Sequence, residues 1–244
     1  MAAAPQVTPE LTRVPDHVGI IMDGNGRWAT SRRLLRPQGH QEGLKAAKRV
    51  VTAAAELGLR YLSLYTFSTE NWRRTADEVR FLMGLVAENL RKEYEFFRKH
   101  DVRVVHSGDL ARLPGEVVAE LDRVQSETAG HGGLAVNLAI NYGGRDEIMR
   151  AFSRILESHK NNGDALEHLS EEQYRQFLDL PDFPDPDLII RTGGEMRMSN
   201  FLLWESAYSE LYFSEKLWPD WEGEDLRSAL LEFQRRSRRF GAAK

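Results

Sequence analysis

The sequence predicts an α/β fold, with a single domain in which a mostly parallel central sheet is flanked by helices. Short apolar runs rich in strand-forming residues alternate along the chain with longer segments whose apolar residues recur at helical spacing. Strands that alternate with helices favour a parallel sheet with helices on its faces. The length of 244 residues suits one large domain, and no repeat, linker or low-complexity segment divides it.

Five short runs are expected to form the strands of this sheet. The segment RYLSLYTF is rich in strand-forming residues, and in LAVNLAI large apolar residues alternate with smaller or polar ones. The other three runs are shorter and apolar, and the first of them ends abruptly in an aspartate. The predicted strands cover residues 18–22, 60–67, 102–106, 134–140 and 188–190.

The segments between these runs are expected to be helical. Apolar residues in 39–57 fall on one helical face, and Gly58 can close that helix. Thr75 can cap a long helix that runs toward His100 with an apolar face. Further helices are predicted over residues 114–129 and 146–159, from residue 170, and over 223–240.

The composition argues against several functional classes. A net charge of -4 gives no support for nucleic-acid binding, and the absence of cysteine excludes disulfides, thiolate metal sites and a cysteine nucleophile. No apolar run approaches the roughly 18 residues of a membrane span. The first 13 residues lack the apolar region of a signal peptide. We therefore expect a cytoplasmic protein that does not bind nucleic acid.

The stretch that follows the first predicted strand has the residues of a phosphate and metal site. Asp23 ends the apolar run, and Gly24, Asn25, Gly26 and Arg27 come directly after it. Glycines let backbone N–H groups approach a ligand closely, and a helix that starts here directs its positive end at the same point. One carboxylate beside several groups that bind anions suits a Mg²⁺ ion that also binds a phosphate ester. The structural alternative is that Asp23 only caps the helix.

Polar, glycine-rich or basic clusters follow four of the predicted strands. In parallel sheets ligands bind outside the carboxyl ends of the strands, so these clusters are expected to meet at one edge. The four clusters lie at residues 23–27, 68–72, 142–145 and 191–195.

Basic residues in this set predict two phosphate-binding centres. Arg27 and Arg36 are spaced to reach one anion, and His40 is well placed for a phosphate at the start of the next helix. Guanidinium groups bind a diphosphate in fork geometry better than lysines do. Two phosphorylated substrates, or one with two ends, would explain two centres. The second centre would consist of Arg191, Arg197 and Ser199.

Several long motifs resemble those of the cis-prenyltransferases, the isoprenyl transferase family whose bacterial archetype is undecaprenyl diphosphate synthase. The motifs are HVGIIMDGNGRWA with RPQGHQEG, SLYTFSTENWRR, NYGGRDEI and DLIIRTGGEMRMSNFLLWESAYSELYF. The resemblance implies a catalytic domain over residues 15–241, between an N-terminal tail of residues 1–14 and a C-terminal tail of residues 242–244.

The resemblance also implies an activity, which is the Mg²⁺-dependent condensation of isopentenyl diphosphate with an allylic diphosphate, expected to be farnesyl diphosphate. The product would be a cis-polyprenyl diphosphate of the undecaprenyl type, for use as a lipid carrier in cell-wall synthesis. Asp23 and Glu210 would lie at the magnesium ion, and Asn71 would take part in proton removal. The growing chain would enter an apolar tunnel that opens at the carboxyl ends of the strands.

Further residues are assigned to the substrates and to the assembly by the same resemblance. The isopentenyl diphosphate site would use Arg191, Arg197 and Ser199. Arg239 and Gly241 would belong to a tail that crosses a homodimer interface, which residues 206–213 would also line. Release of the product would need at most peripheral membrane contact. The allylic diphosphate site would consist of Gly24, Asn25, Gly26, Arg27, Trp28, Arg36, His40, Phe67, Ser68, Trp72 and Arg74.

Three alternatives stay open at this point. A shorter-chain synthase of the same family is one, although the small Thr66 favours a product longer than three isoprene units. A non-catalytic partner subunit of a prenyltransferase complex is another, but it could lose Asp23, which is present. The third is a haloacid-dehalogenase-like phosphohydrolase, which needs a second aspartate where this chain has Asn25.

Overall fold

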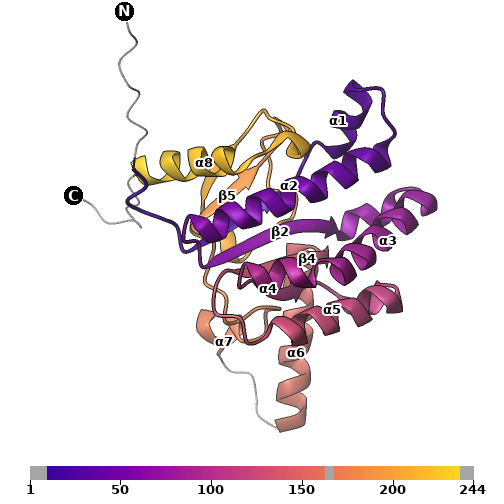
Figure 1. Cartoon of the computed structure of the whole chain (residues 1–244). Helices are drawn as coiled ribbons and strands as arrows, with labels where there is room; N and C mark the ends of the chain where they lie inside the picture. The colour runs from indigo at the N-terminus through magenta and orange to yellow at the C-terminus, as the bar shows by residue number, and fades with distance from the viewer. Residues whose placement is uncertain (1–9, 163–167, 237–244) are drawn as a thin grey trace, which may run out of the picture.

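The computed structural model describes residues 10–162 and 168–236. Their centre is a six-stranded sheet in the order β3-β4-β2-β1-β5-β6 (Figure 1). All five pairings are parallel, which confirms the predicted α/β fold with a parallel sheet. The strands are β1 (His17–Ile21), β2 (Tyr61–Ser68), β3 (Arg103–Ser107), β4 (Ala135–Tyr142), β5 (Leu188–Arg191) and β6 (Glu210–Phe213).

The strand order reverses at β1. The chain leaves β1 for β2 on one side, and it returns much later to place β5 on the other side. Since β1 has neighbours on both sides, all five of its residues are buried. A reversal of this kind opens a crevice at the carboxyl ends of the strands, which is where ligands bind in such sheets. The segment that follows β1 therefore lies at the place expected for a site.

Helices cover the sheet and join its strands. Residues of α2, α3, α5 and α8 form one apolar core with the central strands, whereas α6 and α7 pack together in a separate cluster. Figure 1 shows α2 lying along the sheet near β2, with α3, α4 and α5 below it. The helices are α1 (Asn25–Ser31), α2 (Arg36–Glu56), α3 (Ala76–Lys92), α4 (Tyr94–Lys99), α5 (Gly115–Thr128), α6 (Gly144–Asn162), α7 (Glu171–Arg175) and α8 (Gly223–Arg235).

The structure corrects two of the predicted elements and adds one that was not predicted. The helix expected from Thr75 toward His100 is interrupted, because Glu93 ends α3 and begins α4. The helix expected over 223–240 ends at Arg235, because Arg236 has an extended backbone. A sixth strand, β6, was missed because it has only four residues, lies at the edge of the sheet and has no fully buried residue.

Candidate active site

Asp23 lies at the carboxyl edge of the sheet between two arginines. Its Oδ2 accepts a hydrogen bond from Arg191 Nη2 at 2.9 Å, and Arg27 Nη2 lies 3.3 Å from the same oxygen. Arg191 reaches Asp23 because it ends β5, the neighbour of β1. The residue that caps α1 is Gly24, and no side chain caps the helix. Asp23 is therefore not a helix cap, and its carboxylate faces the site.

The turn after Asp23 is pressed against α2. Gly24 has a φ of 115°, which favours glycine. A Cβ atom on Gly39 would lie 2.1 Å from the carbonyl oxygen of Asn25, and one on Gly43 would lie 2.3 Å from Asn25 Oδ1. Two glycines on α2 thus allow the close approach. The side-chain oxygen of Asn25 is buried and has no hydrogen-bond partner within the described part of the chain, so it is available to a ligand.

The first basic centre forms around a glutamate that sequence reasoning did not single out. Arg74 Nη1 lies 2.9 Å from Glu78 Oε1, and Arg36 Nε lies 4.0 Å from the same atom. Burial, followed by the positive charge of Arg74, lowers the pKa of His40 to about 4, so its imidazole is neutral near pH 7. His40 Nε2 is buried without a partner among the described residues. The spacing of Arg74 and Glu78, one helical turn apart, was the available signal for Glu78.

The second basic centre is built around Arg191. Its Nη1 donates to Ser199 Oγ and to the carbonyl oxygen of Arg197, both at 2.6 Å. Arg197 itself is exposed and pairs with Glu195, whose other oxygen lies 3.8 Å from Arg27. The structure thus brings the two predicted centres together, with Asp23 and Glu195 between them. The sequence analysis placed Glu195 in the cluster at residues 191–195 but assigned it no role.

Aromatic and amide side chains from the end of β2 border the site. Asn71 Oδ1 accepts a hydrogen bond from the backbone N–H of Ser68 at 3.0 Å, which fixes its side chain. Trp72 packs edge-on against Phe67, with ring centroids 5.2 Å apart. The indole N–H of Trp28 donates to Asp220 at 2.6 Å, and unlike Phe67 this residue does not line the cavity described next.

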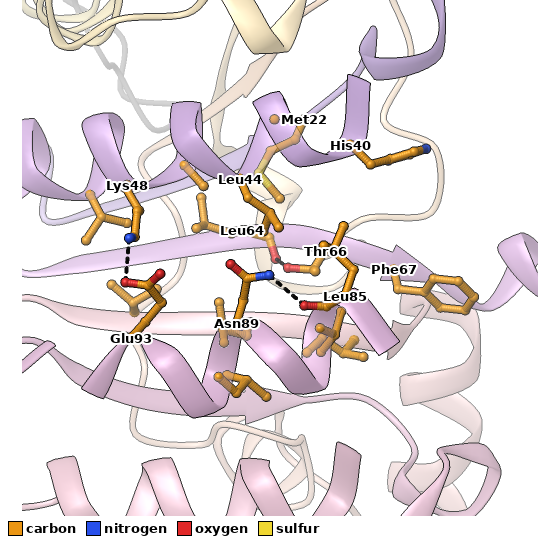
Figure 2. A pocket seen from close by; sticks show the side chains of 18 of the residues that line it. Met22, His40, Leu44, Lys48, Leu64, Thr66, Phe67, Leu85, Asn89 and Glu93 are labelled. Atoms are coloured by element: carbon orange, nitrogen blue, oxygen red, sulfur yellow. Dashed lines mark hydrogen bonds and ion pairs between the residues drawn. The ribbon is translucent and has the colours of Figure 1, made fainter. Parts of the chain in front are cut away.

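An apolar cavity begins beside these residues and runs between α2 and α3 over strands β2 and β4. Its empty volume is about 1080 Å³, including space open to solvent. Figure 2 shows His40 and Phe67 at one end of the cavity. Asn25 lines it as well, so the turn after β1 and the cavity are continuous. The apolar lining includes Leu44, Ala47, Val51, Leu64, Leu82, Leu85, Val86 and Leu90.

The two carboxylates assigned to magnesium lie far apart within one chain. Glu210 pairs in the sheet with Leu188 at the start of β5. Asp23 follows Ile21, which ends β1 and pairs with Arg191 at the end of β5. Glu210 Oε2 instead binds Arg236 Nη1 at 3.0 Å. Within residues 10–162 and 168–236, no group of three or more acidic or histidine side chains could hold a metal ion.

The remaining donor set still fits magnesium, because this ion commonly uses one or two carboxylates, substrate phosphate oxygens and water. Asp23 supplies one partly exposed carboxylate beside two anion-binding centres. Arg239 and Gly241, assigned to the dimer tail, lie outside the described residues.

A family model described as "putative undecaprenyl diphosphate synthase" matches residues 21–241. The chain belongs to this prenyltransferase family. It is 48% identical over 227 residues to an isoprenyl transferase of Treponema denticola, covering 93% of this chain and 97% of the relative. The isoprenyl transferase of Thermotoga maritima is 49% identical over 229 residues, which cover 94% of this chain and 97% of the relative.

Solved structures agree with this prenyltransferase assignment. A lavandulyl diphosphate synthase from Lavandula x intermedia, in complex with dimethylallyl diphosphate, has a TM-score of 0.91 and 34% identity, covering 94% of this chain and 99% of that one. A probable undecaprenyl diphosphate synthase from Campylobacter jejuni has a TM-score of 0.79 and 37% identity, covering 95% of this chain and all of that one. The chain is therefore an enzyme that transfers prenyl groups.

Proposed function

We propose that this prenyltransferase condenses isopentenyl diphosphate with an allylic diphosphate to make a cis-polyprenyl diphosphate of the undecaprenyl type. Farnesyl diphosphate is the proposed allylic substrate. The observation that carries the proposal is the position of Asp23. It lies between Arg27 and Arg191, where two anion-binding centres meet beside an apolar cavity. One centre suits a leaving diphosphate, the other suits a second diphosphate substrate, and the cavity suits an isoprenoid chain.

In the proposed reaction, the bond between the allylic carbon and the diphosphate oxygen breaks, and the diphosphate leaves with the electron pair. Arg27, Arg36, Arg74 and His40 border the place for this leaving group, where positive charge and hydrogen bonds lower the barrier. Mg²⁺ held by Asp23 would neutralise part of the negative charge on the diphosphate.

The alkene of isopentenyl diphosphate then forms the new carbon–carbon bond with the allylic cation, and one proton leaves to complete the new double bond. Arg191, Arg197 and Ser199 are proposed to hold this second diphosphate, so that the alkene stays beside the cation. Asn71, fixed by its bond to the Ser68 backbone, is the residue proposed to take part in proton removal.

Exposed apolar side chains support the proposed homodimer. Met149, Phe152 and Leu156 lie on one face of α6 and are 63%, 46% and 50% exposed. Tyr208 is 75% exposed, just before the edge strand β6. Apolar surface of this kind favours association between protein chains. A second chain would also be needed if Glu210 is to act at the magnesium ion. Within one chain, Glu210 begins β6, whereas Asp23 lies beyond the carboxyl end of β1, at the opposite edge of the sheet.

Contact with a membrane would be peripheral. Within the described residues, no helix combines the length and apolar character needed to cross a bilayer. Leu34 and Leu35 are 38% and 74% exposed in the loop between α1 and α2, with arginines on both sides. Leucines flanked by arginines suit a lipid surface that carries negative charge. The cytoplasmic location and the supply of a cell-wall lipid carrier are parts of this same proposal.

The decisive experiment incubates the protein with farnesyl diphosphate, radiolabelled isopentenyl diphosphate and Mg²⁺, and sizes the extracted lipids. Labelled products of undecaprenyl length support the proposal. Labelled products of only four isoprene units, the shortest that one condensation with farnesyl diphosphate can give, would favour the shorter-chain alternative, to which the dimethylallyl diphosphate bound by the lavandulyl diphosphate synthase lends support. No labelled lipid from a folded protein would favour the partner-subunit alternative. Phosphate release from a generic ester without isopentenyl diphosphate would indicate a phosphohydrolase.

A further inference from the structure

A second cavity lies on the face of the sheet opposite to the apolar cavity. Leu64 of β2 lines the apolar cavity, whereas its neighbour Ser63 lines the second one, because successive side chains of a strand point to opposite faces. The empty volume of the second cavity is about 280 Å³, including space open to solvent. The polar residues that line it are His17, Ser63, Ser107, Asn137, Glu147 and Glu205.

Two glutamates in this cavity share one proton. Glu147 accepts hydrogen bonds from the backbone N–H of Asp179 at 3.0 Å and from the phenol of Tyr142. The carboxyl groups of Glu147 and Glu205 lie within hydrogen-bond reach of each other, and such a bond needs a proton on one of them. Burial, followed by the negative charge of Glu147, raises the pKa of Glu205 well above its usual range. Glu205 therefore carries the proton near pH 7 and donates a hydrogen bond to Glu147.

Within the described residues, the groups around the pair supply no cation in place of this proton. His17 is neutral near pH 7, because burial lowers its pKa to about 4, and its Nδ1 donates to the carbonyl oxygen of Pro184 at 2.6 Å. Arg150 and Arg154 bind the carboxylate of Asp179 instead. The other titratable groups that act on the pair are phenols or carboxylates, namely Tyr142, Tyr174, Asp179 and Asp185.

The segment that leads to Glu205 has a strained backbone. Ser199, Asn200 and Leu202 have φ angles of 49°, 65° and 43°, in the left-handed region that favours glycine. Other residues keep such angles only where surrounding contacts hold them. Leu202 is 4% exposed and lines the second cavity, and Glu205 begins a short 3-10 helix three residues later. Ser199 binds Arg191, so the strained residues lie between the second basic centre and the glutamate pair.

The glutamate pair holds this segment at two points. The first is Glu205 itself, through its hydrogen bond to Glu147. The second is Phe201, which is fully buried and packs edge-on against Tyr142, with ring centroids 6.1 Å apart. Because the phenol of Tyr142 donates to Glu147, both points depend on the same carboxyl group.

We propose that Glu205 is a positioning residue, whose protonated carboxyl group holds residues 199–205 in the shape that presents Arg197 and Ser199 to the second diphosphate. The inference rests on the proposed function, in which this centre binds isopentenyl diphosphate. Loss of the hydrogen bond to Glu147 frees one end of the strained segment. The left-handed residues then relax, and Ser199 loses its alignment with Arg191.

Two matched variants test this role through the KM values of the two substrates. Glu205→Gln is neutral and its amide can still donate to Glu147, so both KM values should stay near those of the wild type. Glu205→Met has a similar length but no donor, and KM for isopentenyl diphosphate should rise by about tenfold, as for the loss of a hydrogen bond to a charged group. The KM for the allylic substrate should change by less than about twofold. Glu171→Met is the control, because Glu171 is exposed at the start of α7.

A milder variant keeps the test decisive if Glu205→Met does not fold. Glu205→Asp retains the carboxyl group but is one methylene too short to reach Glu147, so it should raise the same KM by a smaller factor. If the folded Met or Asp variant had the same KM for isopentenyl diphosphate as Glu205→Gln, the positioning role would be overturned.

Binding without turnover separates this inference from the proposed function. Calorimetry with isopentenyl diphosphate alone requires no condensation. Weaker binding by Glu205→Met or Glu205→Asp than by Glu205→Gln, in a protein that makes no labelled lipid, would keep the positioning role while refuting the proposed function. Equal affinities in these variants would overturn the inference whether or not the protein condenses its substrates.

The shared proton has a readout of its own in the pH dependence of unfolding. The folded protein keeps a proton on Glu205 that the unfolded chain loses above the ordinary glutamate pKa of 4.5, so this contribution to stability falls as the pH rises. Between pH 5 and 7, the unfolding equilibrium constant of the wild type should rise relative to that of Glu205→Gln by up to about tenfold per pH unit. Chemical denaturation measures both constants. Parallel pH profiles would show that Glu205 carries no proton in the folded protein, which would overturn the inference.

Discussion

The two phosphate-binding centres differ in how firmly the protein holds their arginine side chains. Arg191 is 4% exposed and makes hydrogen bonds to Asp23, Ser199 and a backbone carbonyl. The side chain of Arg36 is 63% exposed, and its Nε lies 4.0 Å from the nearest oxygen of Glu78. One centre is fixed before any ligand arrives, because its arginine ends a buried strand. The other centre rests on helices and loops, where side chains keep their freedom.

This difference suits the proposed cycle of substrates. The new product carries the diphosphate that came from isopentenyl diphosphate, so after each condensation it must leave the Arg191 centre for the centre at Arg36 and His40. The centre at Arg36 must in turn release the cleaved diphosphate and accept the longer product. A fixed centre orients the same small substrate in every round, whereas an adaptable centre exchanges its ligand. The following predictions test this contrast, from the largest expected effect to the smallest.

Asp23 is shared by both centres, so its loss should have the largest effect. We expect Asp23→Ala to lower kcat/KM by at least about a thousandfold, since a metal site that stabilises a leaving group contributes several kcal/mol to catalysis. Steady-state assays across a range of Mg²⁺ concentrations provide the measurement. Asp77→Ala is the control, because the side chain of Asp77 is 91% exposed and pairs with Arg80 at 3.2 Å. Activity close to wild type in Asp23→Ala would remove this residue from the metal role.

Arg191→Lys tests whether the second centre depends on a fixed fork. A lysine keeps the charge but cannot bind Asp23 and Ser199 at the same time with the geometry of a guanidinium. We expect kcat/KM to fall by about a hundredfold or more for both substrates, because Asp23 also loses its partner. If only isopentenyl diphosphate were affected, the contact between Arg191 and Asp23 would have no part in allylic ionisation.

Arg197→Ala should act on one substrate alone. Unlike Arg191, Arg197 is exposed, so its guanidinium can exchange its ion pair with Glu195 for one with a diphosphate. We expect KM for isopentenyl diphosphate to rise by about tenfold to a hundredfold, since hydrogen bonds between charged groups contribute about 1.5–3 kcal/mol. The KM for the allylic substrate should stay within a factor of about two, as distant and independent contacts are nearly additive. A normal KM for isopentenyl diphosphate would contradict the assignment.

His40 gives the adaptable centre a pH dependence. Its pKa is about 4 in the free protein, so it is neutral near pH 7. A bound diphosphate beside it would raise this pKa, because negative charge favours the imidazolium form. Binding then takes up a proton, and affinity for an allylic diphosphate analogue should increase as the pH falls from 7 toward 5. Calorimetry in buffers of different ionisation enthalpy measures the uptake.

His40→Asn serves as the control for this titration, because the diphosphate can also bind protons. The variant should bind more weakly and lose the part of the proton uptake that belongs to the imidazole. Equal uptake in the two proteins would show that His40 stays neutral in the complex, and the adaptable centre would then rely on its arginines alone.

The sequence predicted the residues of both centres better than it predicted the contacts between them. Motif spacing and strand ends placed Asp23, Arg36 and Arg191 at one edge, because parallel strands deliver their carboxyl ends to the same side. Glu78 was missed and Glu195 was given no role, since each becomes informative only when the fold brings a distant arginine to it. The helix break at Glu93 was also missed. An apolar face that continues past residue 93 gives no local signal of an interruption, and the break becomes evident only from the backbone conformation of Glu93.

Trp28 gives the smallest and most discriminating prediction, because the resemblance implies contact with substrate and the structure shows contacts within the protein. The resemblance places it in the allylic site, whereas its indole N–H donates to Asp220 at 2.6 Å and Arg32 lies 4.3 Å from its ring centroid. Trp28→Phe should therefore lower the free energy of unfolding by about 1 kcal/mol, the usual cost of one lost hydrogen bond, with little change in allylic KM. Chemical denaturation and steady-state kinetics on the same preparation measure both quantities. A large rise in allylic KM with unchanged stability would return Trp28 to the substrate site and extend the adaptable centre to α1.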